Sequence, residues 1–135
     1  MKKLLIIKPL SLDFGLLLLR LVFAGIMMIQ HGYPKLLDLT SGKKIEFYNF
    51  MGLGESTSLG LAVFAEFFCS ALVVLGLFHR LALVPLIITM AVAFFGVHLG
   101  SDFGKGEAAF IYMMSYVILF FTGPGKISAD DKLFK

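Results

Sequence analysis

Two charged residues, Arg20 and Glu66, lie within long apolar stretches of the sequence, where an unpaired charge is costly. The first apolar stretch ends near His31, eleven residues after Arg20. In a helix, Arg20 therefore lies roughly 16 Å from that end of the stretch. Glu66 lies about eight residues into the second stretch from the same side, roughly 12 Å deep. The difference between these two depths is shorter than the reach of an arginine side chain. We therefore predict a buried ion pair between Arg20 and Glu66.

Two interpretations of this pair stay open. In the first, Glu66 takes up or delivers protons while the nearby charge of Arg20 tunes its affinity for them. In the second, the pair only sets the register of two helices, because each charge needs the other once water is excluded. The two interpretations are compatible.

A second group of polar residues gathers at the predicted helix ends on the outer side. Two histidines and carboxylates placed there could exchange protons or bind a metal, or they could simply form hydrogen bonds with the loops. The chain has no His-x-x-x-His spacing, and we expect no metal site. Two tyrosines of the last apolar stretch could flank a flat ring, or could serve only as packing. The predicted ligand-binding residues are His31, His98, Glu107, Tyr112 and Tyr116.

The sequence offers no electron carrier of its own. A thiol–disulfide relay needs two cysteines, and the chain has one, Cys69, which we expect to be a buried packing residue. There is no flavin or nucleotide motif, and nothing beyond the two histidines His31 and His98 suggests a haem. Any oxidoreductase activity therefore needs a partner or a borrowed cofactor, and whether the chain is itself an enzyme stays open.

The composition indicates what kind of element must position these residues. Of 135 residues, 59% are hydrophobic and only 16% are charged, with a mean hydropathy of +0.91. Soluble domains carry about 25% charged residues, which excludes that class. The basic residues stand in ones to threes at the ends of apolar runs, unlike the clusters of nucleic-acid-binding proteins, and we expect no nucleic-acid partner. The partner that this pattern predicts is the lipid bilayer.

The apolar runs predict an all-α, integral membrane four-helix bundle formed as a single domain over residues 1–135. The expected spans are about 12–31, 59–78, 81–99 and 107–122, joined by an outer loop over 32–58. Seven basic residues lie on the side of the termini and four on the other, and the positive-inside rule therefore places both termini in the cytoplasm. Pro9 and Asp13 interrupt the first run, which predicts a retained helix and no cleaved signal peptide.

The outer loop mixes aromatic residues with Lys43, Lys44 and Glu46. Such a segment either lies along the lipid headgroups or folds over the mouth of the bundle.

Several short motifs, taken in order, resemble the DoxX family of membrane proteins across roughly residues 13 to 131. They are Leu18-Leu19-Arg20-Leu21 running to His31-Gly32 with Lys35, Ala65-Glu66 followed by Gly76-Leu77-Phe78 and Arg80-Leu81-Ala82, His98 with its Gly-rich turn, Glu107, and Gly123-Pro124-Gly125 followed by Ser128 and Asp130. The chain departs from the pattern at Cys69 and Ser70, where the family more often has glycines. The resemblance implies a four-helix protein of the bacterial cytoplasmic (inner) membrane, from a clan that includes small subunits of thiosulfate:quinone oxidoreductases.

The leading functional hypothesis is a membrane subunit of a redox system that binds a quinone or a redox-enzyme partner rather than acting alone. The second is a non-catalytic membrane scaffold or assembly factor that holds a partner through the outer loop. The third is a small-solute transporter, which would need a homo-oligomer because four helices can hardly enclose a pore.

Overall fold

The computed structural model describes residues 2–97 and 103–135, and every regular element in these ranges is a helix. The first long helix is α1 (Leu12–Leu19), η2 (Arg20–Ala24), η3 (Met27–Gly32) and α2 (Tyr33–Thr40). The second is α3 (Glu55–Val63), η5 (Phe64–Cys69) and α4 (Ser70–Leu75), and the third is α5 (His79–Ala91) with η6 (Val92–Val97). The fourth is α6 (Phe103–Thr122), and three short pieces are η1 (Lys2–Leu5), η4 (Phe50–Gly52) and α7 (Ala129–Leu133).

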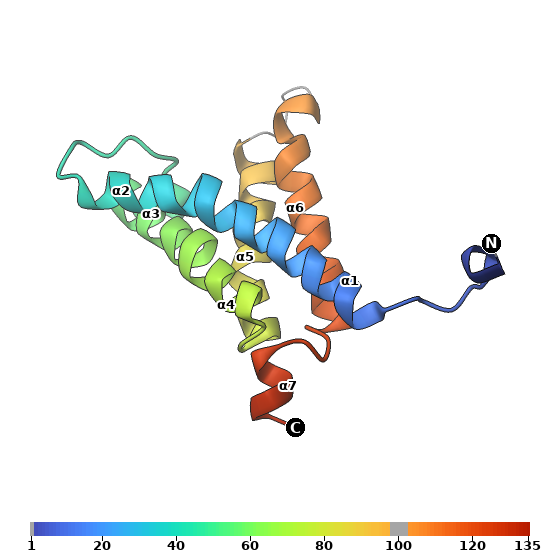
Figure 1. The fold of residues 1–135 in the computed structure, drawn as a ribbon. Coiled ribbons are helices and arrows are strands. Elements are labelled where there is room, and N and C mark those ends of the chain that lie inside the picture. The colour runs from blue at the N-terminus through green and yellow to red at the C-terminus, as the bar shows by residue number, and fades with distance from the viewer. Residues whose placement is uncertain (1, 98–102) are drawn as a thin grey trace.

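Three stretches of helix in the described ranges are long and apolar enough to cross a membrane, Leu12–Thr40, Glu55–Leu75 and His79–Gly96. A shorter apolar helix, Gly106–Thr122, makes the fourth member of the bundle. Figure 1 shows the four packed together with successive helices running in opposite directions. The predicted all-α membrane bundle is confirmed.

Both terminal segments leave the bundle at the same end, which we call the terminal end; the opposite end, beyond Thr40 and before Glu55, is the loop end (Figure 1). Seven of the lysine and arginine residues belong to the terminal end by this topology, and its cytoplasmic location stays a prediction.

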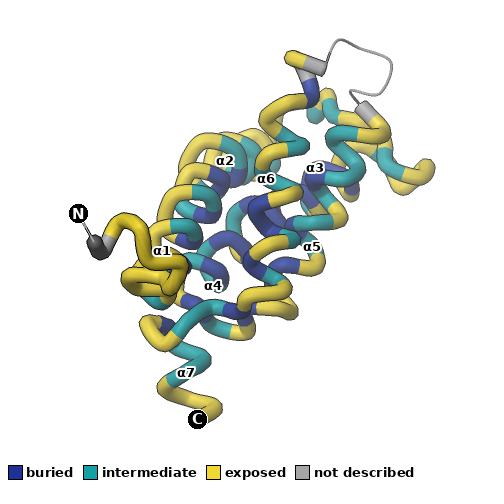
Figure 2. The backbone as a smooth tube through the Cα atoms, turned by 90° about the vertical axis from the view of Figure 1, so that its right-hand side faces the viewer, coloured by how far each residue is buried: buried dark blue, intermediate teal, exposed yellow. Residues whose placement is uncertain are grey.

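The core consists mainly of aliphatic side chains together with the ring of Tyr116, and all four helices contribute to it. Leu83 and Leu86 of α5, Tyr116 and Leu119 of α6, and Val73 of α4 are completely buried. Figure 2 shows the buried positions of these helices facing the middle of the bundle while exposed positions face outward. The outward side chains are themselves mostly apolar, as expected for helices that contact lipid.

The first helix continues past the predicted end of its span. It runs unbroken to Thr40, and the next helix already begins at Glu55, so the connection covers residues 41–54 instead of 32–58. Pro34 lies inside this continuous helix, directly after the π turn η3, and does not stop it.

Four stretches of these helices are π-helical: η2, η3, η5 and η6. A π turn has i→i+5 hydrogen bonds and shifts the following side chains around the helix, and such turns are frequent at functional sites. Arg20, His31 and Glu66 all lie in these turns. A face read from a strict 3.6-residue period is therefore displaced beyond each of them.

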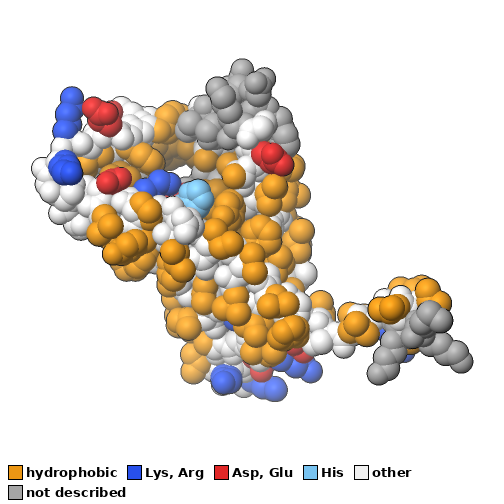
Figure 3. All heavy atoms as spheres, turned by 45° about the horizontal axis from the view of Figure 1, so that its top comes forward, with side chains coloured by type: hydrophobic (Ala, Val, Ile, Leu, Met, Phe, Trp, Pro, Cys, Tyr) orange, Lys and Arg blue, Asp and Glu red, His pale blue; other side chains and the backbone are white. Residues whose placement is uncertain are grey.

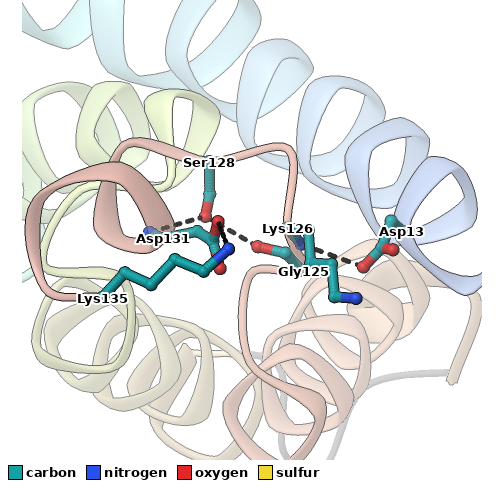
Figure 4. A network of polar contacts seen from close by, with 6 residues as sticks. All are labelled: Asp13, Gly125, Lys126, Ser128, Asp131 and Lys135. Atoms are coloured by element: carbon teal, nitrogen blue, oxygen red, sulfur yellow. Dashed lines mark hydrogen bonds and ion pairs between the residues drawn. The ribbon is translucent and has the colours of Figure 1, made fainter.

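The C-terminal segment is tied back to the terminal end of the bundle (Figure 4). The Lys126 N–H donates to Oδ1 of Asp13 at the start of α1, 2.9 Å away, and the Ser128 hydroxyl donates to the Gly125 carbonyl at 2.7 Å. The same hydroxyl oxygen accepts from the Asp131 N–H at the start of α7. Residues 123–133 are thus a packed part of the fold.

Gly76 ends α4 in a left-handed conformation, with φ of +69°. A Cβ at this position would lie 2.5 Å from Cβ of Ser128 and 3.1 Å from Nη2 of Arg20. The turn between the second and third helices therefore needs glycine for both its backbone angle and its space.

We expect Gly76→Ala to lower the free energy of unfolding by about 1–3 kcal/mol, because it adds backbone strain and a steric clash. Gly60→Ala in α3 is the matched control, since a Cβ there meets nothing within 4 Å and φ is not positive. Thermal unfolding in detergent can be followed with a thiol-reactive dye, because the one cysteine, Cys69, is buried until the protein unfolds. Equal melting temperatures for the two variants would contradict this assignment.

Candidate functional site

Glu66 is buried in the π turn η5, and its partner is Lys35 of α2. The Lys35 ammonium forms an ion pair with Oε2 of Glu66. The carboxylate side chain is 3% exposed and the lysine side chain is 27% exposed. The pair therefore connects a buried acid to the surface at the loop end.

The predicted ion pair between Arg20 and Glu66 is wrong, because each residue has other partners. The physical reason is the direction of side chains, which tilt toward the N-terminus of their own helix. In two antiparallel helices, Arg20 therefore points to the terminal end while Glu66 points to the loop end. Lys35 lies beyond Glu66 on the first helix and points back toward it.

Arg20 is 1% exposed and donates four hydrogen bonds to backbone carbonyls. Its Nε and Nη2 donate to Val73 and Val74 in the last turn of α4, at 3.0 and 2.9 Å. Its Nη1 donates to Pro124 and Ile127, at 2.7 and 2.8 Å. The guanidinium thus satisfies free carbonyls at a helix C-terminus and in the C-terminal segment, where a cation is favoured.

Asp130 holds the neighbouring helix end. Its carboxylate accepts hydrogen bonds from the N–H groups of Phe78 and His79 at the start of α5, at 2.7 and 2.8 Å, and its own N–H donates to the Gly76 carbonyl. His79 is 1% exposed, and its Nε2 lies 3.2 Å from the carbonyl oxygen of Leu119. Lys35 and Asp130 entered the sequence analysis only through the family resemblance, and His79 was not selected as a site residue. Side-chain direction along an antiparallel pair could have identified Lys35 as the partner of Glu66.

A cavity of about 660 Å³ opens beside the Lys35–Glu66 pair. Its walls come from three helices and from the connection over residues 41–54. The lining residues are Lys35, Glu46, Phe47, Tyr48, Phe50, Ser58, Leu61, Ala62, Phe64, Ala65, Glu66, Pro85, Ile88, Thr89, Val92 and Ala93. Most of these side chains are apolar or aromatic, and the few polar groups include the Lys35–Glu66 ion pair. Binding sites for small organic molecules have this composition.

The connection over residues 41–54 folds over the bundle mouth, the second of the two predicted arrangements. The Phe47 ring lies under the Lys35 ammonium, with Nζ 5.8 Å from the ring centroid. The Phe50 N–H donates to the Ser58 hydroxyl at 2.8 Å. A Cβ at Gly96 of η6 would lie 3.2 Å from the Tyr48 hydroxyl oxygen, which shows how closely the connection approaches the third helix. Figure 3 shows the loop end hollowed beside a lobe that carries lysine and acidic side chains.

Three of the other predicted ligand-binding residues form an aromatic row between η3 and α6. The His31 and Tyr112 rings have centroids 5.7 Å apart, and those of Tyr112 and Tyr116 are 6.2 Å apart. The Tyr116 hydroxyl donates to the Phe23 carbonyl at 3.4 Å. None of these side chains lines the cavity beside Glu66. Glu107 is exposed in α6, and His98 lies outside the described residues.

Gly32 sets the distance between the first two helices at the site. A Cβ on Gly32 would lie 2.5 Å from the backbone oxygen of Glu66 and 2.7 Å from the Phe67 nitrogen. The helices therefore touch through their backbones, which places Lys35, three residues further on, within reach of Glu66.

In the described residues, no group of three or more His, Cys, Asp or Glu side chains could hold a metal ion.

Comparisons with known proteins bear on this site. A model of the DoxX family matches residues 15–99, which contain Arg20, Lys35 and Glu66. An uncharacterised protein of Haemophilus influenzae is 34% identical over 129 residues, covering 90% of this chain and 92% of that relative. No solved structure matches the chain.

We expect Gly32→Ala to separate the two helices and to lower the free energy of unfolding by about 1–3 kcal/mol. The control is Gly25→Ala on the same helix, between η2 and η3, because a Cβ there meets nothing within 4 Å. The dye-based melting experiment on Cys69 compares the two. A Gly32→Ala variant as stable as Gly25→Ala would show that the close backbone contact is not needed.

A double-mutant cycle tests the corrected pairing. Lys35→Met and Glu66→Gln should show a coupling energy above about 0.5 kcal/mol, whereas Arg20→Lys and Glu66→Gln should add within that limit because the two sites share no partner. Arg20→Lys alone should cost at least about 2 kcal/mol, since a single ammonium cannot reach four carbonyls as the guanidinium does. Unfolding free energies in mixed micelles provide the measurement. Coupling of Arg20 to Glu66 instead of Lys35 would restore the original prediction.

Proposed function

Because the chain belongs to the DoxX family, we propose that it is a membrane subunit of a redox system and binds a quinone in the cavity beside Lys35 and Glu66. One observation supports this proposal above all others: an apolar cavity of about 660 Å³ has in its wall an ion pair between a buried carboxylate and a partly exposed ammonium. Its size falls in the range of about 300–1,000 Å³ that is usual for organic ligands.

The residues of the cavity match the chemistry of a quinone ring. A ring of this kind is flat and apolar on its faces, which suits walls made by Phe47, Phe50 and Phe64. Its oxygens accept hydrogen bonds, and Lys35 has three N–H donors of which Glu66 does not use all. Reduction and oxidation of the ring move protons, for which Glu66 is the acceptor and donor.

The proton route of this proposal follows from exposure. Glu66 is buried, Lys35 is partly exposed, and the two are in contact, so a proton taken by Glu66 can pass to the loop end by way of the lysine. If both termini are cytoplasmic, the loop end faces outward. We propose that the protein lies in the cytoplasmic membrane of a bacterium, which the distribution of basic residues and its bacterial relative support.

Electrons must come from or pass to another protein under this proposal. The single cysteine and the lack of a flavin or nucleotide motif in the sequence leave ring binding and proton movement to this chain. A redox-enzyme partner would supply the rest.

Lys35→Met should weaken binding of a short-tailed ubiquinone analogue by about 10- to 100-fold, the loss of one hydrogen bond to a charged group. Glu66→Gln should weaken binding less, because it removes only the charge that holds the Lys35 ammonium in place. The controls are Lys43→Met in the connection over residues 41–54 and Glu55→Gln at the start of α3. Both residues are exposed and do not line the cavity. Isothermal titration calorimetry of the detergent-solubilised protein measures the dissociation constants.

Equal binding by all four variants would remove the Lys35–Glu66 pair from the site. A wild-type protein that does not bind the analogue would contradict the proposal and favour a non-catalytic scaffold.

A further inference from the structure

The cavity reaches the surface that faces lipid. Among its lining residues, Leu61 and Phe64 of the second helix and Ile88 of the third are 47%, 53% and 53% exposed. All three lie within stretches long and apolar enough to span the membrane. The gap between these two helices therefore opens sideways into the bilayer.

The same helices turn other faces inward at the cavity. Ala62, Ala65 and Glu66 line it and are buried, whereas Leu61 and Phe64 line it from the outer edge. The small alanine side chains leave the space between the helices, and the larger side chains form the rim. A path bordered by apolar residues thus leads from the lipid surface to the buried carboxylate.

The opening toward water is covered. The connection over residues 41–54 places Glu46, Phe47, Tyr48 and Phe50 in the wall on the loop side. It is fastened by the Lys35–Phe47 contact and by the Phe50–Ser58 hydrogen bond. A ligand dissolved in water meets this cover, whereas a ligand dissolved in lipid meets an apolar gap.

We propose that the cavity takes a long-tailed amphiphile from the bilayer, with its polar ring beside Lys35 and Glu66 and its hydrocarbon tail leaving between Phe64 and Ile88. This inference rests on the proposed function and adds the ligand class, a lipid quinone with an extended tail, together with its route of entry. A cavity of about 660 Å³ suits a ligand of drug size. A ring with a long isoprenoid tail is larger, and its tail has to continue outside the cavity, where lipid surrounds it at no cost in hydration.

Two probes with the same ring distinguish the contribution of the tail to binding from that of the ring. They are dimethoxy-methyl-benzoquinone without a tail and its decyl derivative. Leu61→Trp and Ile88→Trp narrow the lateral gap and leave the Lys35–Glu66 pair untouched. Ile118→Trp is the matched control, because Ile118 is 50% exposed on α6 and does not line the cavity. Dissociation constants are measured with the protein in lipid nanodiscs.

We expect Leu61→Trp and Ile88→Trp to weaken binding of the decyl derivative roughly tenfold, because the tail must bend around the new ring system. Binding of the tail-less ring should stay within about twofold of wild type, and Ile118→Trp should change neither probe. Equal losses for both probes, or no loss for either, would overturn lateral entry while leaving quinone binding in place. Failure of the wild-type protein to bind either probe would overturn the proposed function, and this inference with it.

Discussion

A guanidinium can remain buried in a membrane protein only when its N–H groups find acceptors, and Arg20 meets this condition with backbone carbonyls. The acceptors belong to the end of α4 and to the segment after α6, so one side chain joins three parts of the chain that are distant in sequence. Gly76 and Asp130 complete the same corner, the first by leaving room for the guanidinium and the second by capping α5. These contacts join the first helix, the turn between α4 and α5, and the segment after α6 at the terminal end.

The two ends of the bundle differ because they satisfy their charges differently. At the terminal end, Arg20 is surrounded by carbonyls, two of which belong to the C-terminal segment that closes over it. At the loop end, the helices are joined by a longer connection, and a buried carboxylate is matched by a lysine that is partly exposed. The buried acid of the loop end is therefore connected to the surface, and the cavity lies beside it.

Most of the fold could be predicted, whereas the candidate site could be predicted only in part. The burial of Arg20 was predicted from its place inside a long apolar stretch, and the structure confirms it. The ring contacts of His31, Tyr112 and Tyr116 bring together residues that were selected for their types. The cavity itself was not predictable, because its walls come from segments far apart in the chain and because π turns displace the faces that a regular period implies.

The sequence by itself determined that this is a four-helix membrane protein with charges that need burial and partners, since the transfer of side chains from water to lipid depends mainly on residue type and on run length. Only the tertiary structure decided which charges meet. That choice depends on the direction of each side chain in an antiparallel packing and on the close approach of Gly32 to the backbone of Glu66. Depth along a helix axis gives only one coordinate of a charged group, whereas an ion pair forms only when the two groups meet in all three dimensions.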